Sequence, residues 1–170
     1  QTPGGSDGTF PLPENQLDRF FFSLVLDVPA LEALDAILAR MTEPAEETKP
    51  PVLKAKQLLE MTALVREVLI APEIRRLAAA MVRATHPQDA TAPEKVRRFV
   101  ARGASPRAGE ALILAAKARA LVQGRPHVSR DDLAHYAPAA LRHRLALNFD
   151  GLAEGIAPET IAAEVAAAVK

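Results

Sequence analysis

Cysteine and tryptophan are both absent from this chain of 170 residues. The lack of cysteine excludes disulfides and thiolate metal sites, although it does not fix the cellular compartment. Aromatic residues make up only 4% of the chain, so a core must be built from leucine, alanine, valine and isoleucine. Those residues favour packed helices over a β-sandwich. With 49% hydrophobic and 25% charged residues, the chain has the composition of a globular protein.

An excess of one charge is missing as well, because 21 lysines and arginines balance 21 aspartates and glutamates. Nothing in the bulk charge therefore predicts a nucleic-acid partner. Long hydrophobic runs are also missing, since the run from Phe20 to Val28 is interrupted by Asp27 and falls far short of a bilayer span. The N-terminus does not have the basic and then apolar pattern of a signal peptide. We therefore expect no nucleic acid, no membrane insertion and a cytoplasmic location.

Several catalytic motifs cannot be found. No glycine-rich run ends in Gly-Lys-Ser/Thr, so the chain lacks a Walker A phosphate-binding loop. The nucleophile motif Gly-x-Ser-x-Gly is absent too. The four histidines lack the spacing of metal ligands, and we predict no metal site. These residues alone should therefore not form a complete hydrolase.

One stretch has the pattern of a β-strand. Apolar residues occupy every second position from Phe22 to Val28, which predicts a half-buried strand that ends at Pro29. A single strand leaves its amides unpaired, so its partners must come from elsewhere. The chain also begins with Gln1 instead of methionine. We expect it to be a piece of a longer protein.

The remainder of the sequence predicts helices. Apolar residues recur at helical spacing, proline or a capping residue marks most helix starts, and Pro138 is expected to break one helix and restart it. The segment from His86 to Ala104 reads as a long loop with one helical turn near Val96. The predicted helices are Glu14–Phe20, Ala30–Met41, Lys54–Val68, one that begins at Pro72, one from Pro106 to Gln123, one after the capping box of Ser129 and Asp132, and Pro158–Val169.

Arg19 is the first candidate functional residue. It lies between Asp18 and three consecutive phenylalanines. Either its side chain lies along the apolar surface with its charge in water, paired with Asp18, or its guanidinium is aimed at a negatively charged partner. On physical grounds alone the surface ion pair is the commoner arrangement.

Arg107 is the second candidate. Ser105 is a good N-cap and Pro106 a good first helical residue, which places Arg107 in the first turn. A cation is unfavourable there by about 0.3–1 kcal/mol because of the helix dipole. Either Arg107 is solvated and tolerates this cost, or it binds a phosphate together with the helix N-terminus.

A third basic group, Arg142–Arg144, reads mainly as a solvated face, with docking of a partner or a phosphate as the lesser alternative.

Five segments together resemble the MoxR family of AAA+ ATPases. They are GTFPLPENQLDRF at 8–20, RGASPRA at 102–108, VSRDDL at 128–133, LRHRL at 141–145 and DGLAEGIAPETI at 150–161. Leu-Asp-Arg-Phe alone also occurs in the magnesium-chelatase ATPase subunit, so the combination is the more specific signal. The resemblance implies a mainly α fold, in which residues 1–28 end an α/β P-loop ATPase core and residues 29–170 form a helical-bundle lid domain.

The resemblance also implies roles for four residues. Arg19 corresponds to the arginine finger, which enters the ATP site of the neighbouring subunit, and Asp18 would support it. Arg107 corresponds to the sensor 2 arginine, which contacts the nucleotide phosphates in its own subunit. Thr2 occupies the sensor 1 position, where the family has asparagine in Gln-Asn-Pro and this chain has Gln1-Thr2-Pro3.

The implied function is ATP hydrolysis in an oligomeric ring, expected to be a homo-hexamer, that drives chaperone-like remodelling or maturation of protein complexes. ATP and Mg²⁺ would be bound mainly by the missing core. A protein with a von Willebrand factor A domain is the implied partner. Two alternatives stay open: a metal-chelatase-type AAA+ motor subunit, and a non-catalytic helical interaction module.

Overall fold

The computed structural model describes residues 12–43 and 50–169 of the chain. It consists of two compact units, which are described separately below. Among the described residues, the larger unit combines 12–23 with 64–169, and the smaller one comprises 24–43 and 50–63. Both units are mainly helical, as the sequence predicts.

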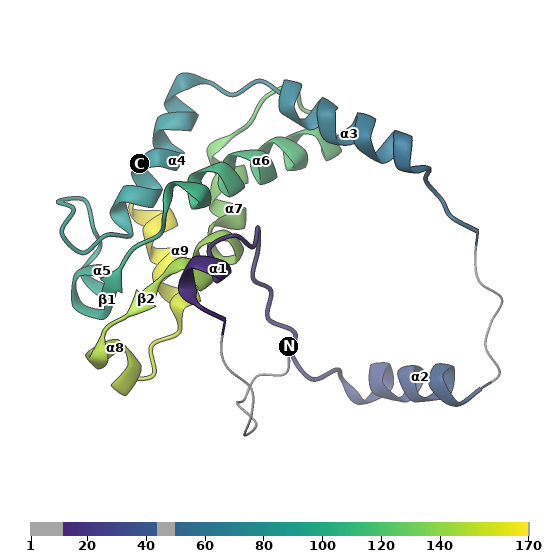
Figure 1. The fold of residues 1–170 in the computed structure, drawn as a ribbon, viewed down its shortest axis with the longest axis horizontal. Coiled ribbons are helices and arrows are strands. Elements are labelled where there is room, and N and C mark those ends of the chain that lie inside the picture. The colour runs from purple at the N-terminus through teal and green to yellow at the C-terminus, as the bar shows by residue number, and fades with distance from the viewer. Residues whose placement is uncertain (1–11, 44–49, 170) are drawn as a thin grey trace. The chain divides into compact units, whose positions relative to one another are not determined.

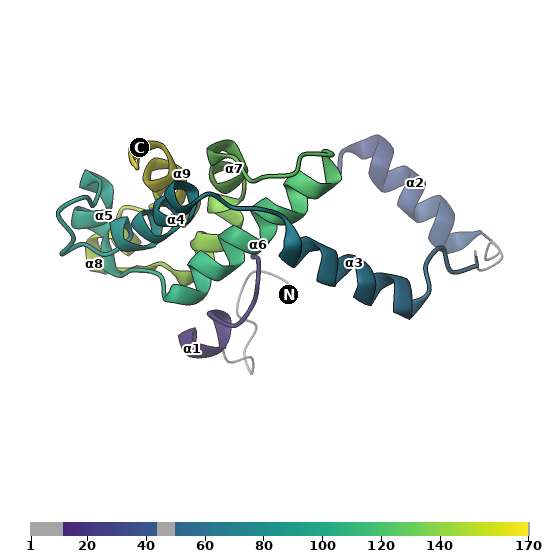
Figure 2. The same cartoon turned by 90° about the horizontal axis from the view of Figure 1, so that it is seen from above.

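The larger unit is a helical bundle built on four helices that contact one another directly (Figure 1). Helix α6 packs against both α4 and α7, and α7 in turn packs against α9. Figure 2 shows the same four helices gathered together from above. Their bounds are Pro72–Ala84 for α4, Pro106–Val122 for α6, Arg130–Leu141 for α7 and Pro158–Ala168 for α9.

Small and branched apolar side chains fill the core of this bundle, in agreement with the scarcity of aromatic residues. Helix α6 buries mostly alanines, which let neighbouring helices approach closely. Larger side chains from α4, α7 and α9, together with Leu112 of α6 itself, fill the remaining space. The largest fully buried ones are Met81, Leu112, Leu133, Leu141 and Ile161.

A small two-stranded ribbon and two short helices lie beside the bundle. Strand β1 (Val100–Arg102) pairs antiparallel with β2 (Ala146–Leu147). Helix α5 (Glu94–Phe99) leads into β1 and packs against α8 (Phe149–Ala153), which follows β2. The 3₁₀ turn η1 (Arg142–Arg144) connects α7 to β2. The ribbon was not predicted, because strands this short show no alternation in the sequence.

The short helix α1 (Glu14–Leu17) contacts η1, and residues 12–23 belong to the larger unit. The contact is built from long-range polar bonds, which are described with the candidate site below.

The smaller unit contains α2 (Leu31–Thr42) and most of α3 (Ala55–Glu67), both close to their predicted bounds. Neither helix buries a residue completely, and the apolar seam of α2 stays at least one-third exposed. The prediction of a helix at each of these positions is confirmed. None of the helices in the described ranges is both long and apolar enough to cross a bilayer.

Two sequence predictions about backbone structure are wrong. Residues 22–28 do not form a strand, because no strand of the described chain lies alongside to pair with them, and only Ser23 donates a backbone hydrogen bond, to the Ala139 carbonyl at 2.9 Å. Pro138 does not interrupt its helix either, since α7 continues through it to Leu141. Buried residues on both sides of the proline, Leu133 and Leu141 among them, hold the helix together despite the missing N–H.

Candidate functional site

The turn after α1 carries Arg19. The amide of Arg19 donates to the Gln16 carbonyl at 3.1 Å, and that of Phe20 donates to the Leu17 carbonyl at 3.1 Å. These bonds fix the backbone on both sides of the arginine. Arg19 itself is exposed, and its side chain forms no ion pair with a carboxylate in residues 12–43 or 50–169. The expected pairing of Arg19 with the adjacent Asp18 is therefore not formed.

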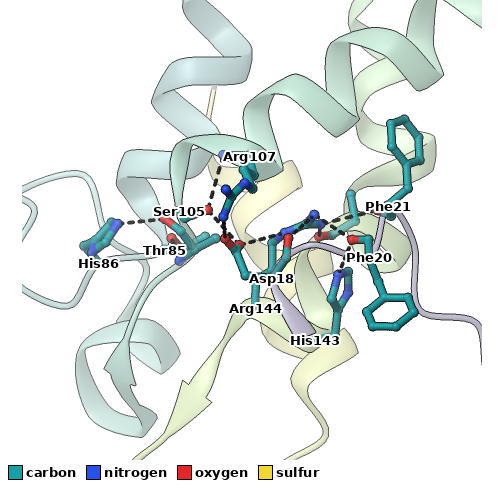
Figure 3. Close-up of polar contacts among 11 residues, drawn as sticks. Asp18, Phe20, Phe21, Thr85, His86, Ser105, Arg107, His143 and Arg144 are labelled. Carbon is teal, nitrogen blue, oxygen red and sulfur yellow. Dashed lines mark hydrogen bonds and ion pairs between the residues drawn. The ribbon is translucent and has the colours of Figure 1, made fainter. Parts of the chain in front are cut away.

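The carboxylate of Asp18 turns inward instead and joins three elements (Figure 3). Its oxygens accept hydrogen bonds from Ser105 Oγ at 2.7 Å, from an Arg107 guanidinium nitrogen at 3.1 Å and from Arg144 Nε at 3.1 Å. Burial by itself would raise the pKa of Asp18. The hydrogen bonds from Ser105, Arg107 and Arg144 outweigh that effect and lower the pKa below its ordinary value. Asp18 is thus held as an anion between two arginines.

Arg144 is the most deeply buried member of this group, with only 2% of its side chain exposed. Besides Asp18 Oδ1, its guanidinium donates to the main-chain carbonyls of Asp18 at 2.9 Å, Phe20 at 2.7 Å and Phe21 at 3.3 Å. All of these partners belong to the turn that carries Arg19. The prediction of a solvated face is therefore wrong for Arg144, because contacts 123 to 126 residues away in sequence remove it from water.

His143 adds a further bond to the same turn. Its Nε2 lies 3.0 Å from the Phe20 carbonyl oxygen. Because a carbonyl only accepts, Nε2 carries the proton in this arrangement. Nδ1 is buried and has no partner in the described part of the chain. Burial is the largest effect on His143 and lowers its pKa, so the ring is neutral at neutral pH.

The N-terminus of α6 places Arg107 as the sequence predicts. Ser105 is the N-cap, and its Oγ accepts the Arg107 amide at 3.2 Å while donating to Asp18. Pro106 is the first helical residue. The guanidinium of Arg107 is 56% exposed and pairs with Asp18 at 3.1 Å. An anion does lie beside this arginine and helix end, and in the structure it is a carboxylate of the same chain.

Thr85, at the end of α4, binds the loop that precedes α6. The buried Oγ1 of Thr85 donates to the Val82 carbonyl at 2.6 Å and accepts the Ala104 amide at 2.9 Å. Gly103 approaches so closely that a Cβ at this position would lie 2.6 Å from the Thr85 carbonyl oxygen. The glycine of the Gly-Ala-Ser-Pro-Arg motif is therefore required by this contact, and the contact sets the start of α6.

A cleft of about 810 Å³ lies beside this network, between α1, the start of α6 and the η1–β2 segment. Asp18 and Ser105 contact the cleft, whereas Arg19 and Arg107 lie outside it. Its charged lining is mainly basic and includes Arg102, which pairs with Glu14 at the rim. The cleft therefore adjoins the candidate residues, but neither Arg19 nor Arg107 lines it.

Of the predicted site residues that the structure describes, only two are brought into contact with each other. Asp18 and Arg107 are in direct contact, and Arg19 lies next to Asp18 in the chain but points to no partner in the described ranges. Thr2 lies outside the described residues. Arg144, His143 and Thr85 were missed as site residues, although Arg144 and His143 belong to the Leu-Arg-His-Arg-Leu motif that signals the family. In the described ranges, no three histidine, aspartate or glutamate side chains gather as metal ligands would.

Comparison with known proteins gives concordant matches. Residues 92–165 match the AAA lid domain family. Chaperone MoxR1 of Mycobacterium tuberculosis is 35% identical over 161 residues, which cover 95% of this chain and 42% of that protein. YeaC of Bacillus subtilis is 35% identical over 173 residues, which cover 100% of this chain and 51% of that protein.

A crystal structure of a Cytophaga hutchinsonii protein assigned as an ATPase also matches. It covers 100% of this chain and 52% of its own, with a TM-score of 0.91 and 28% sequence identity. The chain spans about half the length of the curated relatives it matches. These similarities agree with the five sequence segments and with the helical bundle. The chain therefore corresponds to the C-terminal part of a MoxR-family AAA+ protein, with a helical lid domain.

Proposed function

We propose that the full protein hydrolyses ATP in an oligomeric ring and uses the energy for chaperone-like remodelling or maturation of protein complexes. One observation carries this proposal. Asp18 is bound to Arg107 at the N-terminus of α6, while the adjacent Arg19 is exposed and forms no ion pair within the described ranges. One arginine is thus engaged within its own chain, while the arginine next to Asp18 in sequence is exposed and available to a neighbouring subunit.

Arg107 fits a role as the phosphate contact in its own subunit. It lies in the first turn of a helix of 17 residues, where backbone N–H groups and the helix dipole attract anions. More than half of its side chain is exposed, and it already binds a carboxylate. A phosphate oxygen would take the place of Asp18 on the guanidinium. The position of the lid would then depend on whether nucleotide is bound.

Arg19 fits a role as the finger offered to a neighbouring subunit. In phosphoryl transfer, such an arginine stabilises charge on the transferring group and is worth roughly 10³–10⁵ in rate, about 4–7 kcal/mol. The turn is held by Asp18 and by the backbone bonds on both sides of the arginine. We assign Asp18 as a positioning residue, since its carboxylate binds Ser105, Arg107 and Arg144.

Mg²⁺ belongs to this proposal as well, and when bound it would neutralise charge on the phosphates. The described residues offer phosphate contacts and no cluster of three acidic or histidine ligands, so we assign only the phosphate contacts to them. We assign the sensor 1 role to Thr2, whose hydroxyl can donate a hydrogen bond.

We further propose that residues 1–28 end the ATPase core and that residues 29–170 form the lid. The bonds from Ser105, Arg107 and Arg144 to Asp18 would then cross the boundary between the two domains. The ring would be a homo-hexamer in the cytoplasm, and a protein with a von Willebrand factor A domain would be its partner. These assignments follow from the family resemblance.

The test is ATP turnover and nucleotide binding by the full protein, measured for wild type, Arg19→Ala and Arg107→Ala. Arg76→Ala is the matched control, because Arg76 is an exposed arginine on α4. Arg19→Ala should lose at least about 10³-fold in kcat and still bind nucleotide. Arg107→Ala should weaken nucleotide binding, and the control should match wild type.

Other outcomes assign the protein to the alternatives. A wild-type protein that neither binds nor hydrolyses ATP would contradict the proposal and favour a helical interaction module. Hydrolysis that both arginine variants retain would contradict the assigned roles. Sedimentation of the full protein with and without nucleotide tests the ring, and a single species of monomer mass under both conditions would exclude a finger in trans.

A further inference from the structure

The binding pattern of Arg144 extends the proposed function to a residue with no assigned role. Its guanidinium donates to the carbonyl of Asp18 on one side of Arg19, and to those of Phe20 and Phe21 on the other. It also binds the carboxylate of Asp18 and, in α7, the carbonyl of Ala140. None of these bonds reaches the Arg19 side chain. The backbone that carries Arg19 is thus held on both sides by one guanidinium (Figure 3).

Arginine is the one side chain that can make this set of bonds. Its planar guanidinium presents five N–H donors in fixed directions, whereas the ammonium of lysine has only three donors at one point. Only 2% of the side chain is exposed, so Arg144 has exchanged water almost entirely for these partners. A buried cation is tolerated only when its donors are satisfied. The pocket is therefore specific for a guanidinium.

The same network reaches the proposed phosphate contact. Asp18 binds Arg144 through Nε at 3.1 Å and binds Arg107 at 3.1 Å, and Ser105 donates to it at 2.7 Å. Arg144 lies in η1, directly after α7, and Arg107 lies in α6, which packs against α7. The Asp18 carboxylate thus connects the turn that presents Arg19 to two parts of the helical bundle, the start of α6 and η1.

We propose that Arg144 is a positioning residue for the finger, so that the lid of one subunit sets the geometry of the Arg19 that it offers to the next subunit. The inference rests on the proposed function. Displacement of a catalytic group by about 1 Å costs on the order of 10²-fold in rate. Replacement of Arg144 should therefore lower kcat of the neighbour's site by about 100-fold and leave nucleotide affinity of its own site within about threefold.

The experiment uses mixed rings of the full protein, formed by co-expression of two differently tagged variants. Arg144→Met subunits keep an intact nucleotide site but present Arg19 poorly. Arg107→Ala subunits have an impaired nucleotide site but an intact finger. Each variant alone should turn over ATP slowly. Their mixture should exceed the sum of the two by at least about tenfold, because intact sites then receive intact fingers.

Two controls make the result specific. A mixture of Arg144→Met with Arg19→Ala should show no gain, since neither subunit supplies a working finger. Arg142→Met should match wild type, because Arg142 lies in the same turn but binds Pro138 and Glu159. A mixture of Arg144→Met and Arg107→Ala with no gain over the sum would overturn the inference, and so would an Arg144→Met protein with wild-type kcat.

Arg144→Lys keeps a cation beside Asp18 but cannot supply the full set of carbonyl bonds. It replaces Arg144→Met in the same mixtures if the methionine variant does not fold. We expect kcat to fall by about tenfold and to recover on mixing, whereas wild-type kcat for the lysine variant would overturn the inference. Failure of the proposed function can be told apart from failure of this inference. If the proposed function is wrong, Arg19→Ala turns over ATP like wild type, independently of the result for the Arg144 variants.

Discussion

Neutralisation of Asp18 is expected to change stability and nucleotide affinity in opposite directions. Asp18→Asn keeps the shape of the side chain and one acceptor oxygen, but it removes the negative charge between Arg107 and Arg144. Charge-assisted hydrogen bonds are roughly twice as strong as neutral ones. Arg144 and Ser105, both bonded to this carboxylate, would therefore each lose about half of one bond's contribution.

The magnitude follows from the exposure of each partner. A hydrogen bond to a charged group contributes about 1.5–3 kcal/mol, so half of the bond from the buried Arg144 is about 1 kcal/mol. The Ser105 bond adds about half that amount. The Arg107 pair is largely solvated and contributes at most about 1 kcal/mol. We expect the free energy of unfolding to fall by about 2 kcal/mol in all.

Nucleotide affinity should change the other way. In the wild type, Arg107 must leave Asp18 before it binds a phosphate. Without the charge this competition is weaker, and a pair worth up to about 1 kcal/mol corresponds to a gain of up to about fivefold in affinity. Chemical unfolding followed by circular dichroism measures the first effect, and a fluorescent nucleotide measures the second.

Asp35→Asn is the matched control, since Asp35 is exposed on α2, and it should change the free energy of unfolding by less than about 0.5 kcal/mol. The reasoning is refuted if Asp18→Asn leaves stability unchanged, or if it weakens nucleotide binding. Weaker binding would mean that Asp18 helps Arg107 to bind phosphate instead of competing with it.

Three further predictions concern the fold around the site. Gly103→Ala should destabilise the protein by about 1–3 kcal/mol because its Cβ would meet a backbone carbonyl at 2.6 Å. Gly109→Ala is the control within α6: its Cβ would meet only the Val82 side chain at 3.4 Å, so this change should be neutral or stabilising in the same unfolding assay. Ser105→Ala should cost about 1–2 kcal/mol as a lost N-cap, which equilibrium urea unfolding would measure; no loss would contradict the capping role. Burial alone would raise the pKa of Asp132, but hydrogen bonds from Arg125, Ser129 and Arg119 outweigh burial and lower the pKa below its ordinary value. Its contribution to stability is therefore complete above about pH 4 and lost as pH falls through the folded pKa. Asp132→Asn should remove about 3 kcal/mol at pH 7 and flatten the acid side of the stability profile; an unchanged profile would contradict this.

Local patterns in the sequence predict the helices well. The apolar spacing and the start signals of α4, α6 and α9 lie within a few neighbouring residues, so they can be read without the fold. The same holds for the capping box at Ser129, where Asp132 accepts the Ser129 amide at 2.8 Å. The strand at 22–28 is different, because a strand exists only where another strand pairs with it.

The polar network could be predicted only in part. Arg107 and Asp18 were found through the family motifs, but their mutual contact spans 89 residues of sequence. Arg144 looks like one of three similar basic residues in the sequence. Only the fold shows that it is buried and its neighbour Arg142 is partly exposed. Burial of a charged side chain depends on distant partners, which single-residue patterns do not contain.

The alanine-lined helix α6 has a mechanical consequence. Its 17 residues make a helix about 26 Å long, which packs against α4 and α7. Arg107 lies at one end, and towards the other end Lys117 donates to the Arg66 carbonyl at 2.7 Å, where α3 finishes. A tilt of about 5° at the Arg107 end would displace Lys117, about 15 Å along the helix, by about 1.3 Å. A tilt of α6 at its first turn would therefore be passed on, through Lys117, to the end of α3.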